Sequence, residues 1–136
     1  MQLSTKYITG VYEETDNILH LWCVSPVNLN RADLLEAFFG ETRQWVKSCP
    51  VKPCLLTNFN SLEIGVDLTT EYARQVKLLQ AMVLGVFRYG LSEDLSGRFT
   101  SMAVRMGNMK NSSSSNIYSD EVTARRAIQQ FKVQAQ

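Results

Sequence analysis

The alternation of strand-like and helix-like periodicity along the chain constrains its fold most strongly. The patterns predict the element order β-β-α-β-α-β-α-β-α. The predicted strands cover residues 6–13, 18–24, 54–59, 82–89 and 117–118. Strands that alternate with helices are joined by crossover connections, which place the helices against the faces of a sheet. A short polar turn separates the two opening strands, which favours an antiparallel hairpin.

The length agrees with this order, because 136 residues is an ordinary size for one domain. We therefore predict an α/β fold with a single domain over residues 1–136. The expected architecture is a mixed sheet of about five strands that opens with a hairpin, with about four helices packed mainly on one face.

Each predicted helix has a start signal and an apolar stripe. The start signals are, in chain order, Asn28 or Asn30, Asp67 or Thr69, Ser92, and the run 119–121. The third helix carries Leu95, Phe99, Met102, Ala103 and Met106 at the spacing of a buried face, and it is expected to stop at 107–108. The first helix is rich in aromatic residues, which favour core packing, with a ligand-binding box as the alternative. Residues 60–67 are predicted to form a loop.

Charge and hydropathy exclude several classes of function. The chain has 14 basic and 13 acidic residues, and a net charge of +1 does not support a nucleic-acid-binding protein. No apolar run reaches the roughly 18 residues that span a bilayer. Residues 1–6 lack the apolar core of a signal peptide. These features lead us to expect a cytoplasmic protein with no transmembrane segment and no nucleic-acid partner.

The cysteine and histidine content argues against metal, redox and triad chemistry. Three cysteines without an export signal favour reduced thiols. Cys49 and Cys54 are separated by four residues, which is not the spacing of a CxxC site. His20 is the only histidine, so a site with several histidine ligands is excluded and a catalytic triad would depend on this residue. We expect no catalytic residue, no metal and no cofactor.

The small net charge conceals an asymmetry between the halves of the chain. Residues 1–68 have 5 basic and 8 acidic side chains, a net charge of −3, whereas residues 69–136 have 9 basic and 5 acidic side chains, a net charge of +4. Seven of the nine basic residues of the second half are candidates for a face that binds an acidic partner, a nucleotide or a membrane surface, with scattered solvated charges as the alternative. They are Arg74, Arg88, Arg98, Arg105, Lys110, Arg125 and Arg126.

The segment that follows the fourth predicted strand is a candidate anion site. Arg88-Tyr89-Gly90 ends this strand shortly before Ser92. Ligands of open α/β sheets bind at that edge, and free helix amides favour anions. Arg88, Tyr89 and Ser92 are therefore the predicted anion- or partner-binding residues, with helix capping as the alternative interpretation. No glycine-rich phosphate loop accompanies them.

Two stretches of sequence carry a family resemblance. One is the opening hairpin, with TDNILHLWC at 15–23, and the other is the C-terminal run SNIYSDEVTARRAI at 115–128. Together with the element order, they resemble the SpoIIAA-like fold of STAS domains, the anti-sigma-factor antagonists, and in particular their small bacterial members.

The resemblance implies a regulatory serine or threonine at a helix N-terminus behind a central strand, where free amides accommodate a phosphate. The matching segment, 59–71, offers Ser61, Thr69 and Thr70. It lacks the family's Asp-Ser-Ser-Gly pattern, so simple helix capping is the alternative for these residues.

The resemblance also implies a non-enzymatic regulatory or protein-interaction module of bacterial type. Its expected partner is another protein, and a homodimer is an option on base rates alone. The alternative is a small-molecule or lipid-binding domain with its ligand in a cavity between the sheet and the apolar helices.

Overall fold

The computed structural model describes residues 6–111 and 115–134. The serine-rich composition of residues 111–116 is typical of an exposed loop, and half of this stretch, 112–114, lies outside the described residues. The predicted absence of a signal peptide rests largely on residues 1–5, which also lie outside them.

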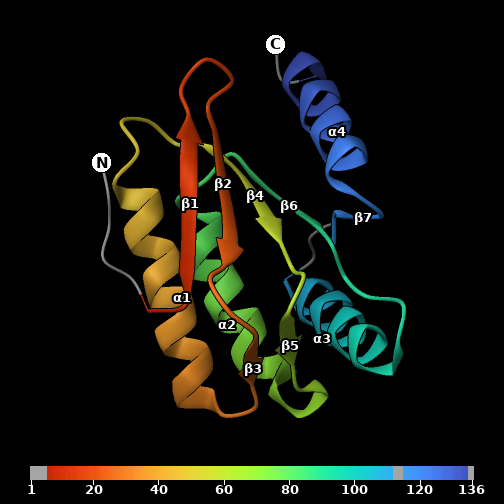
Figure 1. Cartoon of the computed structure of the whole chain (residues 1–136). Helices are drawn as coiled ribbons and strands as arrows, with labels where there is room; N and C mark the ends of the chain where they lie inside the picture. Colours follow the sequence, from red (N-terminus) through yellow and green to blue (C-terminus); the bar gives the residue numbers. More distant parts are fainter. Residues whose placement is uncertain (1–5, 112–114, 135–136) are drawn as a thin grey trace.

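The main sheet has the predicted mixed topology (Figure 1). Its strands lie in the order β1-β2-β4-β6-β7. The bounds are β1 (Ile8–Glu13), β2 (Ile18–Cys23), β4 (Cys54–Asn58), β6 (Gly85–Tyr89) and β7 (Ile117–Tyr118). β1 and β2 form the antiparallel hairpin, and every other neighbouring pair is parallel. The predicted α/β fold with an opening hairpin is therefore confirmed.

Two further strands form a small parallel sheet that was not predicted. β3 (Val27–Leu29) pairs with β5 (Leu62–Ile64). The prediction that residues 60–67 form a loop is therefore wrong in part, since β5 lies within this range. The two strands were not recognised because each has only three residues and shows a single buried-exposed-buried alternation. Asn28 lies inside β3 and caps no helix, and the residue at the N-cap position of the first helix is Arg31, with no capping side-chain bond.

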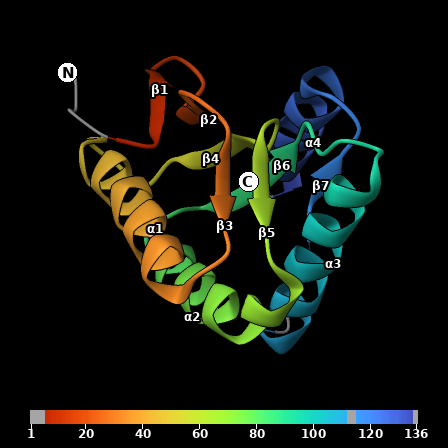
Figure 2. The ribbon, with the colours of Figure 1, turned by 60° about the horizontal axis from the view of Figure 1, so that its bottom comes forward.

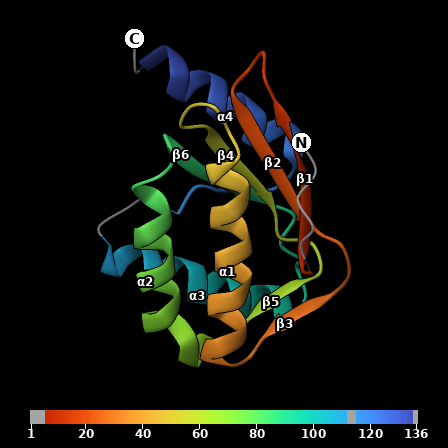
Figure 3. The same ribbon diagram turned by 90° about the vertical axis from the view of Figure 1, so that its left-hand side faces the viewer.

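The helices occupy both sides of the main sheet. Their bounds are α1 (Ala32–Lys47), α2 (Thr69–Gln80, preceded by the 3-10 turn η1, Val66–Leu68), α3 (Leu95–Lys110) and α4 (Glu121–Gln134). Strand alternation divides the core in two: Leu19 and Val86 pack with α1 and α2 on one face, whereas Ile18 and Phe87 pack with α4 on the other. Figure 3 shows α1 and α2 side by side along one face of the molecule.

Helix α3 packs on α2, η1 and β5 rather than across the centre of the main sheet. Figure 2 shows α1, α2 and α3 arranged around β3 and β5. Helix α2, η1 and the small sheet therefore support α3 from one side, and among the described residues no other helix or strand has extensive contacts with that helix. Among the described residues, no helix combines the length and the apolar character that crossing a bilayer requires.

Candidate functional site

Helix α3 provides the candidate functional surface, and hydrogen bonds fix where it begins. Gly90 ends β6 with a φ of +87°, a conformation that glycine adopts without strain. Asp94 is the N-cap: its carboxylate accepts the Gly97 amide at 2.9 Å and the Ser92 hydroxyl at 2.6 Å. The prediction that Ser92 caps the helix is therefore wrong, and Ser92 instead supports the residue that does.

The inner face of α3 consists of small and polar residues. Gly107 lies against the ring of Tyr72 in α2, where an added Cβ would be 2.5 Å from the ring carbon Cδ2. The Thr100 hydroxyl accepts the backbone amide of Ile64 at 3.1 Å, which ties the helix to β5. The predicted stop at 107–108 is wrong, because both residues are buried inside the helix, which continues to Lys110.

The large apolar side chains of α3 therefore point outward. Their exposed fractions are Leu95 66%, Phe99 46%, Met102 47%, Met106 43% and Met109 76%. The prediction that this stripe is buried is wrong for all but Ala103, because the close approach of α3 to α2 leaves room only for small side chains on the inner face. We refer to Leu95, Phe99, Met102, Met106 and Met109 as the α3 stripe. Contiguous exposed apolar patches of this kind mark interaction sites.

The charges on α3 are all positive. Arg98, Arg105 and Lys110 are exposed, and the helix contains no acidic residue. Arg105 donates to the Ser101 hydroxyl at 3.2 Å, and within the described residues neither Arg98 nor Arg105 has a carboxylate partner. The helical periodicity of 100° per residue places Arg98 and Arg105 along one border of the α3 stripe and Lys110 along the other.

A groove of about 450 Å³ runs beside this arginine border. On one side it is lined by Ser92, in the segment that precedes α3, and by Arg98 of α3. On the other side it is lined by Tyr118 of β7 and by Ser119, the next residue. The groove therefore lies next to the carboxyl end of β6, at the edge where the sequence predicted binding. Of the three residues predicted for that site, only Ser92 lines the groove.

Arg88 and Tyr89 point to opposite faces of the sheet, since they are neighbours on one strand. Arg88 is 2% exposed, and its guanidinium donates to the backbone oxygen of Ser115 at 2.5 Å. The Tyr89 hydroxyl lies 2.6 Å from the His20 ring on the α4 side. The structure does not bring Arg88, Tyr89 and Ser92 together.

The three residues predicted for phosphorylation differ in accessibility. Ser61 is exposed in the turn between β4 and β5, with a φ of +68°. Thr69 is buried at the start of α2, and its hydroxyl donates to the oxygen of Val66 at 2.6 Å. Thr70, next to it, is exposed. Their modification stays a prediction, and none of the three lines the groove beside α3.

A polar cluster that the sequence did not predict joins α4 to the hairpin. Arg125 forms two hydrogen bonds of 2.7 Å with Glu13 and one of 2.8 Å with Glu121. An Arg125 nitrogen lies 3.4 Å from His20 Nδ1, and Tyr89 donates to Glu121 at 3.3 Å. We call Glu13, His20, Tyr89, Glu121 and Arg125 the Arg125 network. The side chains of this network are hydrogen-bonded to one another, and these bonds hold α4 against the sheet.

The donors available in the Arg125 network fix the histidine tautomer. Arginine only donates, so His20 Nδ1 accepts and His20 Nε2 carries the proton toward the Tyr89 oxygen. Burial lowers the pKa of His20; the charges of Glu121 and Glu13 oppose this shift and the charge of Arg125 adds to it. The Arg125 hydrogen bonds lower the pKa of Glu13 and of Glu121, and burial raises the pKa of Tyr89 to about 12.

These pKa shifts predict stability that falls at both ends of the pH scale. The lowered pKa values of His20 and both glutamates mean that the unfolded state binds more protons in acid, so stability falls as pH drops below about 6.5 and again below about 4.5. The raised pKa of Tyr89 means that stability is lost as pH rises from 10 toward about 12. Urea unfolding from pH 4 to 11 tests this profile, and the substitution His20→Gln should remove the first acid step alone. A first acid step that persists in that variant would contradict the assignment.

Neither the cysteine thiols nor the clustering of side chains points to nucleophilic or metal chemistry in the described residues. Burial raises the pKa of Cys23 to about 11 and also raises the pKa values of Cys49 and Cys54, so these thiols are poor nucleophiles at neutral pH. Within the described residues, no three histidine, cysteine, aspartate or glutamate side chains cluster as metal ligands would.

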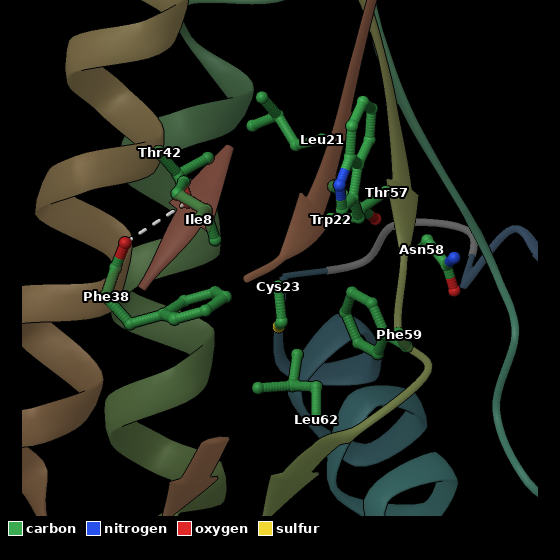
Figure 4. A pocket seen from close by; sticks show the side chains of 10 residues that line it. All are labelled: Ile8, Leu21, Trp22, Cys23, Phe38, Thr42, Thr57, Asn58, Phe59 and Leu62. Carbon is green, nitrogen blue, oxygen red and sulfur yellow. Dashed lines mark hydrogen bonds between the residues drawn. The ribbon is translucent and has the colours of Figure 1, made fainter. Parts of the chain in front are cut away.

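The apolar cavities between the main sheet and the helices are small. Figure 4 shows one of them, walled by Phe38, Phe59 and Leu62 among others, with a volume of about 20 Å³. A second cavity, beside Tyr72 and Arg88, also measures about 20 Å³. Each has room for about one water molecule, whereas sites for drug-sized ligands need roughly 300 Å³ or more.

Comparisons with known proteins support the fold. No family model and no curated protein sequence matches this chain. A solved structure titled "The overall structure of SLC26A9" is similar over 94% of this chain, with a TM-score of 0.57 and 12% sequence identity. This chain spans 24% of the length of that one. The architecture matches a STAS-like fold, and at this identity the likeness concerns the fold alone.

Proposed function

We propose that this protein is a non-enzymatic interaction module that binds an amphipathic, acidic helix of a partner protein on the α3 stripe. The observation that carries the proposal is the outward orientation of the five large apolar side chains of α3, which are 43–76% exposed. A STAS-like fold is consistent with such a regulatory or interaction role.

The shape and composition of the surface favour a helix as the occupant. α3 has 16 residues and is therefore about 24 Å long, which matches about four turns of a second helix. Docking of the apolar face of one helix on an apolar strip is a recurring mode of recognition. Three of the five side chains of the α3 stripe are methionines, whose flexible thioethers adapt to the shape of a partner.

The charges beside the α3 stripe favour acidic residues on that partner. Arg98 and Arg105 lie along one border of the α3 stripe, and neither has a carboxylate partner in the described part of the chain. Guanidinium groups bind carboxylates in a bidentate geometry that adds specificity as well as affinity. Carboxylates that flank the apolar side of a partner helix would meet this border.

A protein partner fits better than a bilayer surface. α3 has three cations, whereas binding to anionic lipids typically uses clusters of 4–8. Glu93 and Glu63 are exposed near the start of the helix, where Ser96 donates to Glu63. A broad anionic membrane would meet these carboxylates, whereas a partner helix can place its own carboxylates beside Arg98 and Arg105 alone. The 450 Å³ groove beside α3 is concave and polar, so polar side chains of a partner protein could enter it.

Peptide titration tests the proposal. The probe is an amphipathic peptide of about five helical turns with leucines on one face and glutamates beside them, and its matched control has lysines in place of the glutamates. We expect the glutamate peptide to bind about tenfold tighter or more, with an affinity that falls as salt is raised.

Two results would contradict the proposal. One is equal binding, or no binding, of the two peptides. The other is binding to vesicles of phosphatidylcholine with about 30% phosphatidylserine in preference to either peptide, which would point to a membrane surface instead.

A further inference from the structure

A second groove lies between α4 and the β6–β7 edge of the main sheet. Figure 1 shows α4 beside these two strands. The volume of this groove is about 470 Å³, which falls within the range of small-molecule sites. It shares no residue with the α3 stripe, and Tyr118 is its only residue in common with the groove beside α3.

Three aromatic side chains form the wall of this second groove. Phe87 is buried on the sheet, while Tyr118 of β7 and Phe131 of α4 are half-buried beside it. The Phe87 and Tyr118 rings are stacked, with planes 21° apart and centroids separated by 6.4 Å. The Phe87 and Phe131 centroids are 5.6 Å apart. The three rings form a continuous aromatic surface.

The rest of the lining is uncharged and consists of Leu84, Gly85, Asn116, Ala127, Gln130 and Gln134. Gln130 and Gln134 are exposed at the rim, one turn apart on α4, and within the described residues neither amide has a hydrogen-bond partner. At Gly85 an added Cβ would lie 3.0 Å from the Phe87 ring and 3.3 Å from the Phe131 ring, so glycine keeps this wall clear. Among the residues that the structure describes, no lysine, arginine, aspartate or glutamate lines the groove.

We propose that this groove binds a flat, uncharged aromatic or heteroaromatic ring that carries an amide or hydroxyl group at its edge. The ring would stack or pack edge-on against the aromatic wall, while the free glutamine amides bond its polar edge. A charged ligand is disfavoured, because the groove offers no countercharge to offset desolvation. The inference stands independently of helix binding by the α3 stripe.

Three matched small molecules test this site. Benzamide is flat, uncharged and carries an edge amide. Cyclohexanecarboxamide has the same amide on a saturated ring, and benzoate has the same ring with a charge. We expect benzamide to bind about fivefold or more tighter than either control, and to shift the side-chain amide signals of Gln130 and Gln134 in an NMR titration.

A double variant assigns the binding to this groove. Gln130→Ala with Gln134→Ala should weaken benzamide binding about fivefold or more, whereas Gln129→Ala, an exposed neighbour on the same helix, should leave it unchanged. All three glutamines are exposed, so the variants are expected to fold as the parent does. Equal affinity for benzamide and cyclohexanecarboxamide, undiminished binding in the double variant, or no benzamide binding at all would overturn the proposal.

Discussion

Replacing Phe99 and Met106 by aspartate will weaken binding of the acidic helix peptide by about 100-fold or more. The two residues lie on either side of Met102, the middle residue of the α3 stripe, and each should contribute about 1.5–3 kcal/mol of apolar contact when a partner covers it. The new carboxylates also repel the acidic partner. Both side chains are more than 40% exposed in the free protein, so folding should change by no more than about 1 kcal/mol.

A matched pair on α4 controls for the added negative charge. Val122 and Val133 are 65% and 70% exposed, and Val122→Asp with Val133→Asp adds the same two charges on another helix. This control should reduce peptide affinity by less than about threefold. Titration calorimetry of both double variants measures the difference. An equal loss in the two variants would show that net charge, rather than the α3 stripe, governs binding.

Replacing Gly107 by alanine will destabilise the protein by about 1–3 kcal/mol, although alanine is the better helix former. The new Cβ would lie 2.5 Å from the Tyr72 ring, and that ring is fully buried, so α3 must move away from α2. The prediction follows directly from the close approach of the two helices, which also turns the α3 stripe outward.

The matched control is the same substitution at Gly40, in the middle of α1. A Cβ there would meet nothing closer than the end of Arg43, 3.9 Å away, so Gly40→Ala should stabilise the protein by about 0.5–1 kcal/mol. Urea unfolding of the two variants gives both free energies. Destabilisation of the same size at Gly40 and Gly107, or stabilisation at both, would rule out tight packing at the α2–α3 contact.

The sequence predicted four of the five strands of the main sheet because they are long enough to show a pattern, whereas the two-residue β7 was placed by its position just before the helix start at 119–121. β2 has six residues and β4 has five, and both are followed by clear turn or helix signals. β3 and β5 have three residues each, which is too few for a period of two to be recognised. The small sheet that supports α3 was therefore missed.

The residues of the α3 stripe were recognised by their helical spacing, but their orientation was not. A stripe of large apolar residues normally faces the core. In α3 the opposite face carries glycine, alanine, threonine and valine, and this face packs because α2 presents a bulky tyrosine to it. Periodicity reports that one face differs from the other, and packing decides which face is buried.

The Arg125 network could be anticipated only in part. Glu121 and Arg125 are four residues apart on one helix, which is the spacing of a salt bridge. The bond from Arg125 to Glu13 joins residues 112 positions apart and depends on the whole fold. The predicted site at Arg88, Tyr89 and Ser92 failed for a simpler reason, since neighbours on a strand point to opposite faces.

The methyl signals of the methionines test the central claim most directly. The chain has five methionines, of which Met102, Met106 and Met109 belong to the α3 stripe, while Met82 packs against the core. In protein labelled with ¹³C at the methionine methyl groups, addition of the acidic helix peptide should shift the three α3 signals and leave that of Met82 in place. Binding that leaves the three α3 signals unmoved would show that the partner docks elsewhere and would contradict the account.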